Sequence, residues 1–127
     1  MSKFTGVAPA FLVADVGATI SWYQGELGFI SYPFPKKPPY VFASVCRDGI
    51  EIMFQLLRGY EKPDLHRLRD GGVWDAYIRM EGAKELYEAI KDKVEIKMSL
   101  RQQPYHDWEF EVKDPNGYIL VFSELID

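Results

Sequence analysis

The sequence predicts an α+β fold assembled from two copies of one strand–helix–three-strand unit. Two β-hairpins support this prediction: one spans Trp108–Glu124, and the strands of an earlier one are residues 41–46 and 50–55. Further upstream, each hairpin is preceded by an apolar strand, an acidic or small residue and an amphipathic helix. The repeat is about 65 to 70 residues long, which is too long for a solenoid and indicates duplication of one unit.

The final hairpin is the most clearly predicted element. Phe110 and Val112 alternate with charged residues, as in a half-buried strand, and residues 119–122 form an apolar run rich in β-formers. Between the two strands, residues 114–117 read Asp-Pro-Asn-Gly. The Asp can bond the backbone two residues on, the Pro presets φ, and Asn-Gly tolerates positive φ. This composition predicts a tight turn.

The first half of the chain contains the same kinds of element. Residues 9–13 are expected to form a strand, and Asp15 then predicts the N-cap of a helix that ends at Gly28. Four prolines in residues 31–40 exclude a central strand. This segment is either an edge strand with a rigid exposed connection, which we favour, or a loop at the mouth of a cavity.

The second half begins with a long polar connection, residues 57–72, in which a short helix is expected near residues 64–68. Its mixed charges indicate a solvated surface, although loops of this length are often functional and a role as a lid stays open. A strand over 77–80 and a helix over 83–91 follow. The helical spacing predicts that this helix turns three side chains toward the core: Leu86, Ala89 and Ile90.

Composition limits the class of protein. A chain of 127 residues is one domain, and its single cysteine, Cys46, excludes an intramolecular disulfide. Neither a signal-peptide pattern nor a membrane-spanning apolar run is present, so we expect a cytoplasmic protein. The formal net charge of −4 argues against binding nucleic acid or an anionic membrane and favours a cationic ligand.

Several short motifs together resemble the vicinal oxygen chelate superfamily. They are Val-Ala-Asp-Val (13–16), Ser-Trp-Tyr (21–23), Leu-Gly-Phe (27–29) and the terminal Glu-Phe-x-Val-x-Asp-Pro-Asn-Gly-Tyr (109–118). This superfamily contains glyoxalase I, bleomycin resistance proteins, fosfomycin-modifying enzymes and extradiol dioxygenases.

The resemblance implies the glyoxalase/bleomycin resistance fold. In this fold two βαβββ modules form curved mixed sheets around a cavity, which is often completed by a second chain. Mapped onto this sequence, the first module covers about residues 1–57, a linker covers about 58–72, and the second module covers about 73–127.

Enzymes of this superfamily hold a divalent metal with side chains from four strands. The resemblance places the four positions on Ala8, Glu51, Asp75 and Val121, and a one-residue shift would move the third to Trp74. Ala8 and Val121 have no lone pair to offer, whereas a catalytic metal site needs about three protein ligands. We therefore expect no bound metal, no other cofactor and no catalytic residue.

Within the superfamily, these features resemble the bleomycin resistance branch. Its members are metal-free, acidic homodimers that sequester a bulky cationic drug. The resulting hypothesis is a non-catalytic small-molecule binding protein that forms a homodimer and sequesters a cationic aromatic compound or an antibiotic. The expected ligand-binding residues are Glu51, Asp75, Trp74, Tyr40, Trp108 and Tyr105. Three alternatives stay open. The protein could be a metal-dependent glyoxalase-like lyase, transferase or dioxygenase, or an isomerase or hydrolase that uses Glu51 as a base without a metal. Glu51 could also simply face solvent on an open sheet.

Overall fold

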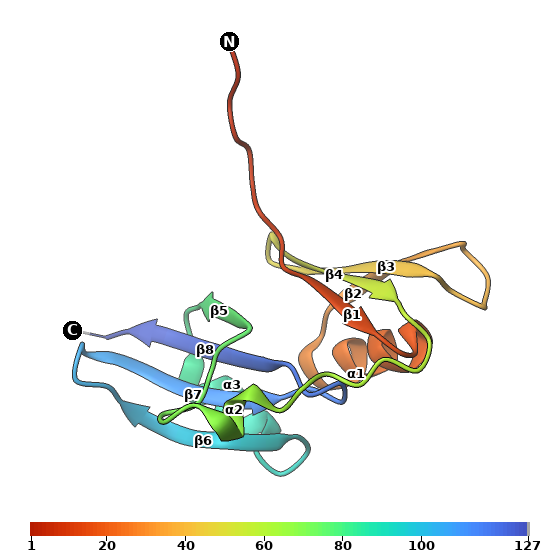
Figure 1. The fold of residues 1–127 in the computed structure, drawn as a ribbon. Helices are drawn as coiled ribbons and strands as arrows, with labels where there is room; N and C mark the ends of the chain where they lie inside the picture. Colours follow the sequence, from red (N-terminus) through yellow and green to blue (C-terminus); the bar gives the residue numbers. More distant parts are fainter. Residues whose placement is uncertain (127) are drawn as a thin grey trace. The chain divides into compact units, whose positions relative to one another are not determined.

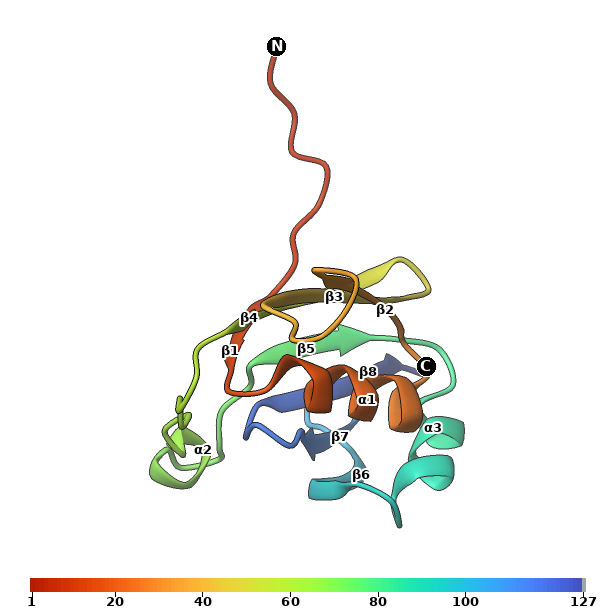
Figure 2. The ribbon, with the colours of Figure 1, turned by 90° about the vertical axis from the view of Figure 1, so that its right-hand side faces the viewer.

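The computed structural model describes residues 1–126 and divides them into two compact units. Unit 1 is Met1–Glu61, and unit 2 begins at Lys62. Asp127, the last residue of the second expected module, lies outside the described residues. Each unit contains one four-stranded sheet and one longer helix (Figure 1 and Figure 2).

Unit 1 follows the order strand, helix, three strands. Its elements are β1 (Ala10–Val13), α1 (Val16–Leu27), β2 (Ile30–Phe34), β3 (Phe42–Arg47) and β4 (Ile50–Leu56). The sheet has the strand order β1-β4-β3-β2, in which β1 and β4 are parallel and the other neighbours are antiparallel.

Unit 2 repeats this arrangement after a short additional helix. Its elements are α2 (Leu65–Leu68), β5 (Ala76–Arg79), α3 (Ala83–Ile90), β6 (Glu95–Gln102), β7 (Asp107–Lys113) and β8 (Ile119–Leu125). The strand order β5-β8-β7-β6, with β5 and β8 parallel, matches that of unit 1. The predicted α+β fold of two βαβββ modules is therefore confirmed.

Helix α1 begins and ends where its capping residues predict. The Asp15 carboxylate accepts a hydrogen bond from the Ala18 backbone N–H at 3.0 Å, and Gly28 ends the helix at φ 71°. Tyr23 is fully buried, and its ring centroid lies 4.9 Å from that of Phe54 on β4. The helix thus covers one face of the first sheet with an aromatic core.

The proline-rich segment includes an edge strand, as favoured from the sequence. Strand β2 pairs with β3 alone, so Pro33 can lie in it without interrupting a ladder on both sides. The β3–β4 hairpin closes through Asp48 and Gly49, which have φ values of 51° and 79°. Positive φ at both central residues is the geometry that matches the twist of a two-residue hairpin.

The β7–β8 turn is held by the side chain predicted for it. Asp114 is buried, and its Oδ1 accepts hydrogen bonds from the backbone N–H groups of Asn116 and Tyr118, each at 2.9 Å. Gly117 has φ 94°, and its N–H donates to the Asp114 carbonyl at 3.0 Å. Side chain and backbone of one aspartate therefore organise the whole turn.

Helix α3 differs in detail from its prediction. Ala89 is exposed, so its assignment to the core is wrong, because Tyr87 takes the inward position and packs on Phe110 with ring centroids 5.2 Å apart. Gly82 offers no side-chain cap, and the carboxylate of Glu124 on β8 accepts from the Ala83 N–H at 2.9 Å instead. A distant strand therefore caps the helix. Within residues 1–126, no helix is both long and apolar enough to cross a bilayer.

We expect Gly117→Val to lower the free energy of unfolding by about 1 kcal/mol or more. The space around a Cβ at this position is open, with the nearest side-chain atoms 3.9 Å away, so the cost arises from the positive φ. Gly25→Ala on the exposed side of α1 is the matched control. It should raise stability by about 0.5–1 kcal/mol. Urea unfolding of both variants checks this, and an unchanged midpoint for Gly117→Val would contradict it.

Candidate functional site

The face of the second sheet opposite α3 carries three carboxylates in alternate positions of β7. Phe110 points toward α3, so strand alternation places Asp107, Glu109 and Glu111 on the other face. Their exposed fractions are 7%, 1% and 4%. We call this surface the acidic face. The prediction that β7 is a half-buried strand is wrong, because side chains on both of its faces are buried.

Glu109 lies at the centre of the acidic face and accepts hydrogen bonds from two phenols. The Tyr105 hydroxyl donates to Oε1 at 2.7 Å, and the Tyr77 hydroxyl donates to Oε2. Ser123 lies directly opposite Glu109 in the β7–β8 ladder, with its Oγ 2.9 Å from the Tyr77 hydroxyl oxygen. Within residues 1–126, no basic side chain forms an ion pair with Glu109. Its buried charge is therefore satisfied by neutral donors.

Asp107 is joined to the same network from the end of β7. Its Oδ2 lies 3.0 Å from the Tyr77 hydroxyl and accepts from the Ser123 hydroxyl at 3.0 Å. Arg79 approaches this oxygen at 3.4 Å, although 73% of the arginine side chain is exposed. Because an exposed ion pair is screened by water, this guanidinium offsets only part of the buried charge.

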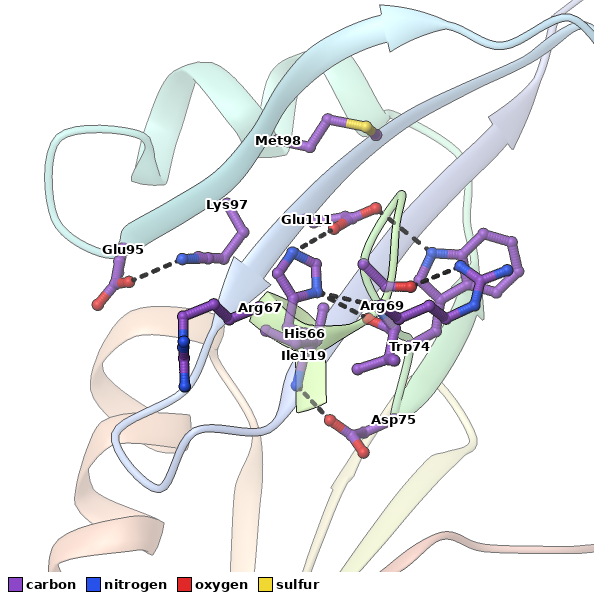
Figure 3. A network of polar contacts seen from close by, with 12 residues as sticks. His66, Arg67, Arg69, Trp74, Asp75, Glu95, Lys97, Met98, Glu111 and Ile119 are labelled. Carbon is purple, nitrogen blue, oxygen red and sulfur yellow. Dashed lines mark hydrogen bonds and ion pairs between the residues drawn. The ribbon is translucent and has the colours of Figure 1, made fainter. Parts of the chain in front are cut away.

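Glu111 has a different pair of partners. Trp74 Nε1 donates to its Oε2 at 3.3 Å, and His66 Nε2 faces its Oε1 at 3.7 Å (Figure 3). Burial raises the pKa of the Glu111 carboxyl, while the hydrogen bond from Trp74 and the charge of His66 act in the opposite direction. The indole ring of Trp74 also lies against Tyr77, with ring centroids 4.9 Å apart.

The acidic face also alters the two phenols that serve Glu109. Burial, followed by the hydrogen bond to Glu109, raises the pKa of Tyr77 to about 12. The same two causes raise the pKa of Tyr105. Both hydroxyls therefore remain protonated as donors throughout the physiological range.

The structure brings two of the expected ligand-binding residues, Trp74 and Tyr105, onto the acidic face. Trp108 is the β7 neighbour of these carboxylates but points to the opposite side of the strand, where Lys84 of α3 lies 4.4 Å above its ring. Asp75 accepts a hydrogen bond from the Ile119 N–H at 2.8 Å and lies 3.6 Å from Lys62. Its carboxylate thus holds the start of β8.

The other two expected residues, Tyr40 and Glu51, belong to unit 1. Tyr40 packs beside Gly17 at the start of α1, 3.7 Å from the position a Cβ would take there. Glu51 is half-buried on β4 opposite Cys46, which is itself half-buried.

Sequence reasoning did not identify the residues that form the acidic face: Tyr77, Asp107, Glu109, Glu111, Ser123 and His66. One signal was present, because acidic residues recur at every second position of residues 107–111. That pattern also describes an ordinary solvent-facing strand. Only the burial of all three carboxylates separates the two cases.

The four positions carried over for a metal do not form a set of ligands. Val121 is fully buried and lies opposite Tyr77 and Glu111, whereas Asp75 precedes β5 and pairs with Ile119. The ladder register therefore sets a tyrosine, and neither Asp75 nor Trp74, opposite Val121. Among residues 1–126, no three His, Cys, Asp or Glu side chains come together in a way that could hold a metal ion.

The raised pKa of Tyr77 predicts a specific loss of stability in alkali. The folded-state value of about 12 exceeds the unfolded value of about 10, so the contribution of Tyr77 is complete below about pH 10 and is lost as the pH rises toward 12. Denaturant unfolding between these pH values should show a falling free energy, and Tyr77→Phe should make that fall smaller. Tyr32→Phe on the exposed side of β2 is the control and should leave the slope unchanged. Equal slopes in all three proteins would contradict the assignment.

No protein-family model and no curated protein matches the chain. Among solved structures, a bleomycin-binding protein from Streptomyces verticillus, complexed with copper(II)-bleomycin, is 24% identical, with a TM-score of 0.70 and 98% of each chain covered. A glyoxalase-related enzyme from Clostridium phytofermentans is 15% identical, with a TM-score of 0.76 and 98% of each chain covered.

A third solved structure supports the same fold. A glyoxalase/bleomycin resistance protein/dioxygenase from Nocardioides is 15% identical, with a TM-score of 0.68, and the match covers 100% of this chain and 87% of that one. All three likenesses extend over nearly the whole chain and include both units. The chain therefore has the same fold as these proteins, the glyoxalase/bleomycin resistance fold.

Proposed function

We propose that this protein is a non-catalytic small-molecule binding protein whose ligand is a cationic aromatic compound bound at the acidic face. The observation that carries the proposal is the row of three buried carboxylates on β7. Buried charge is costly unless it is paired, and Glu109 is served by neutral phenols alone. A positively charged ligand would supply the charge that this face lacks.

The balance of charges supports a cation. The three carboxylates are set against two guanidinium groups, Arg79 beside Asp107 and Arg101, which lies opposite Glu109 in the β6–β7 ladder. Among these five groups, one negative charge remains in excess. A cation binding here would gain from weak screening, because the carboxylates are removed from water.

Aromatic side chains at the same face support an aromatic ligand. Trp74 is 52% exposed and Tyr105 is 49% exposed, although each donates a hydrogen bond to a buried carboxylate. A flat cationic ring could stack on Trp74 while its charge approaches Glu111 or Glu109. The bleomycin-binding structural neighbour, complexed with copper(II)-bleomycin, makes a drug of that type the first compound to test.

Binding should depend on the charge of Glu109. We expect copper(II)-bleomycin or another cationic aromatic compound to raise the melting temperature, with about 2.7 kcal/mol of stabilisation at a hundredfold excess over Kd. Glu109→Gln should weaken that binding about tenfold or more, because the charge is removed while the shape and an acceptor for the phenols remain. Calorimetric titration at two salt concentrations measures both effects.

Glu88→Gln is the matched control, since Glu88 lies on the exposed side of α3 and pairs with Lys91. Glu51→Gln tests the carboxylate of unit 1, which we retain as a proposed ligand contact. Neutral aromatic analogues that bind as tightly as cationic ones would exclude the proposal. Stoichiometric zinc, nickel, manganese or iron that survives dialysis would favour a metal-dependent lyase, transferase or dioxygenase instead.

We also propose that the working form is a cytoplasmic twofold homodimer. Support comes from the side of β2 that points away from α1, where Ile30, Tyr32 and Phe34 are 63%, 57% and 63% exposed. A row of large exposed apolar side chains is typical of an interaction surface. The single free Cys46 fits a reducing compartment.

Light scattering at micromolar concentration should report a dimer, and Phe34→Glu should shift it to monomer because a charge would be buried at the interface. Lys36→Glu, in the exposed connection after β2, is the control for an added acidic residue nearby. A wild-type protein that is monomeric at all concentrations would rule out the dimer.

A further inference from the structure

The position of His66 depends on a glycine that lies six residues later. A Cβ built on Gly72 would lie 2.2 Å from Cε1 of the His66 ring, a distance that real atoms do not adopt. Gly72 also has φ 79°, which favours glycine. The loop that follows α2 is therefore shaped around the imidazole ring, and its backbone closes against the ring (Figure 3).

The backbone beside Gly72 orients the ring. The Val73 N–H donates to His66 Nδ1 at 3.0 Å; the neutral tautomer that accepts this hydrogen bond carries its proton on Nε2, which faces Glu111. The same Nδ1 lies 3.1 Å from the Val73 carbonyl oxygen, which can accept a hydrogen bond from the charged ring. Both charge states of the imidazole therefore find a backbone partner, and in both an N–H group is directed at Glu111.

Little else attaches α2 to the sheet of unit 2. None of its four residues is buried, and Leu65 and Leu68 are 49% and 69% exposed. Arg67 pairs with Asp64 within the same segment, and Arg69 donates to the Gly72 carbonyl at 2.6 Å. Besides His66, Lys62 also anchors this segment, because its Nζ lies 3.6 Å from the Asp75 carboxylate and 5.3 Å from the centroid of the Tyr118 ring. A helix attached mainly through side-chain charges opens at low cost.

Glu111 is the point where this attachment meets the proposed ligand site. Its carboxylate is 4% exposed and is shared between His66 and Trp74, the most exposed aromatic residue of the acidic face. The other charges near it are Glu109 on the same strand and Arg101 on β6. A cation that stacks on Trp74 would therefore compete with His66 for the same carboxylate.

We propose that His66 is an internal, exchangeable partner of Glu111: it holds the part of the connection that belongs to unit 2, residues 62–72, on the acidic face of the unliganded protein, and a ligand cation replaces it. This inference rests on the proposed function, since it names the residue that the ligand displaces. It makes His66 a positioning residue that lowers ligand affinity and couples binding to release of the connection.

Amide hydrogen exchange tests the attachment without any ligand. Glu111→Gln removes the charge that holds His66, so exchange should become faster at the Arg69 and Val73 amides, which bond within α2 and to the imidazole. Gly72→Ala should also speed exchange at these two amides, because the added Cβ displaces the His66 ring. Arg67→Gln, on the same helix but paired only with Asp64, should leave the Val73 rate unchanged. Unchanged exchange in Glu111→Gln would overturn the inference.

Ligand binding tests the exchange itself. Saturating copper(II)-bleomycin should speed exchange at Arg69 and Val73, and His66→Gln should bind roughly threefold or more tightly than wild type, because no internal partner competes. Slower exchange on binding, or equal or weaker affinity of His66→Gln, would overturn the inference while leaving the proposed function intact. If no cationic aromatic compound binds the wild type, the proposed function fails, and the unliganded exchange rates still decide whether His66 attaches the connection.

Discussion

The structure of unit 2 depends on how strand β7 buries acidic side chains on one face while its other face packs into the apolar core. A strand directs alternate side chains to opposite faces, and β7 must bury Phe110 and Val112 beneath α3. The intervening positions hold acids that are also removed from water. Phenol, hydroxyl and indole donors make this burial possible, because they satisfy the carboxylate oxygens without covering the face with apolar groups. The positions of Tyr77, Tyr105, Ser123 and Trp74 follow from the need to donate hydrogen bonds to these carboxylates.

Unit 1 shows what the same topology does with different side chains. Its sheet has the same strand order, yet the face opposite α1 carries exposed apolar residues on β2 and the single carboxylate of Glu51 on β4. The duplication therefore preserved the backbone and the helix-covered core while the two remaining faces diverged in chemistry. One carries buried carboxylates, and the other carries exposed apolar side chains. One fold can therefore present faces of different chemistry, because the side chains and not the backbone determine it.

The connection between the repeats contains a helix that local sequence determines, but the position of that helix depends on distant residues. Asp64 caps α2 through the Arg67 N–H at 3.2 Å, so the short helix follows from local sequence. The position of α2 over the sheet does not follow from local sequence. It depends on Gly72, whose missing Cβ leaves room for the His66 ring, and on the carboxylate of Glu111 in β7. Contacts of this kind join segments that no local pattern links. They also explain why a histidine without any neighbouring motif can still lie at a defined site.

Local physical chemistry in the sequence determined the elements of this protein. Asp15 and Gly28 bound α1 because capping needs a short acceptor and a residue that tolerates positive φ, and Asp114 with Gly117 forms the last turn for the same reasons. The duplication was also readable, since each copy repeats the same order of periodicities. Tertiary structure decided the burial of Glu109, the pairing of Glu111 with Trp74 and His66, and the use of Asp75 to hold β8. Strand alternation gives the two sides of a strand but not which side is covered or by what, because that depends on partners distant in the chain.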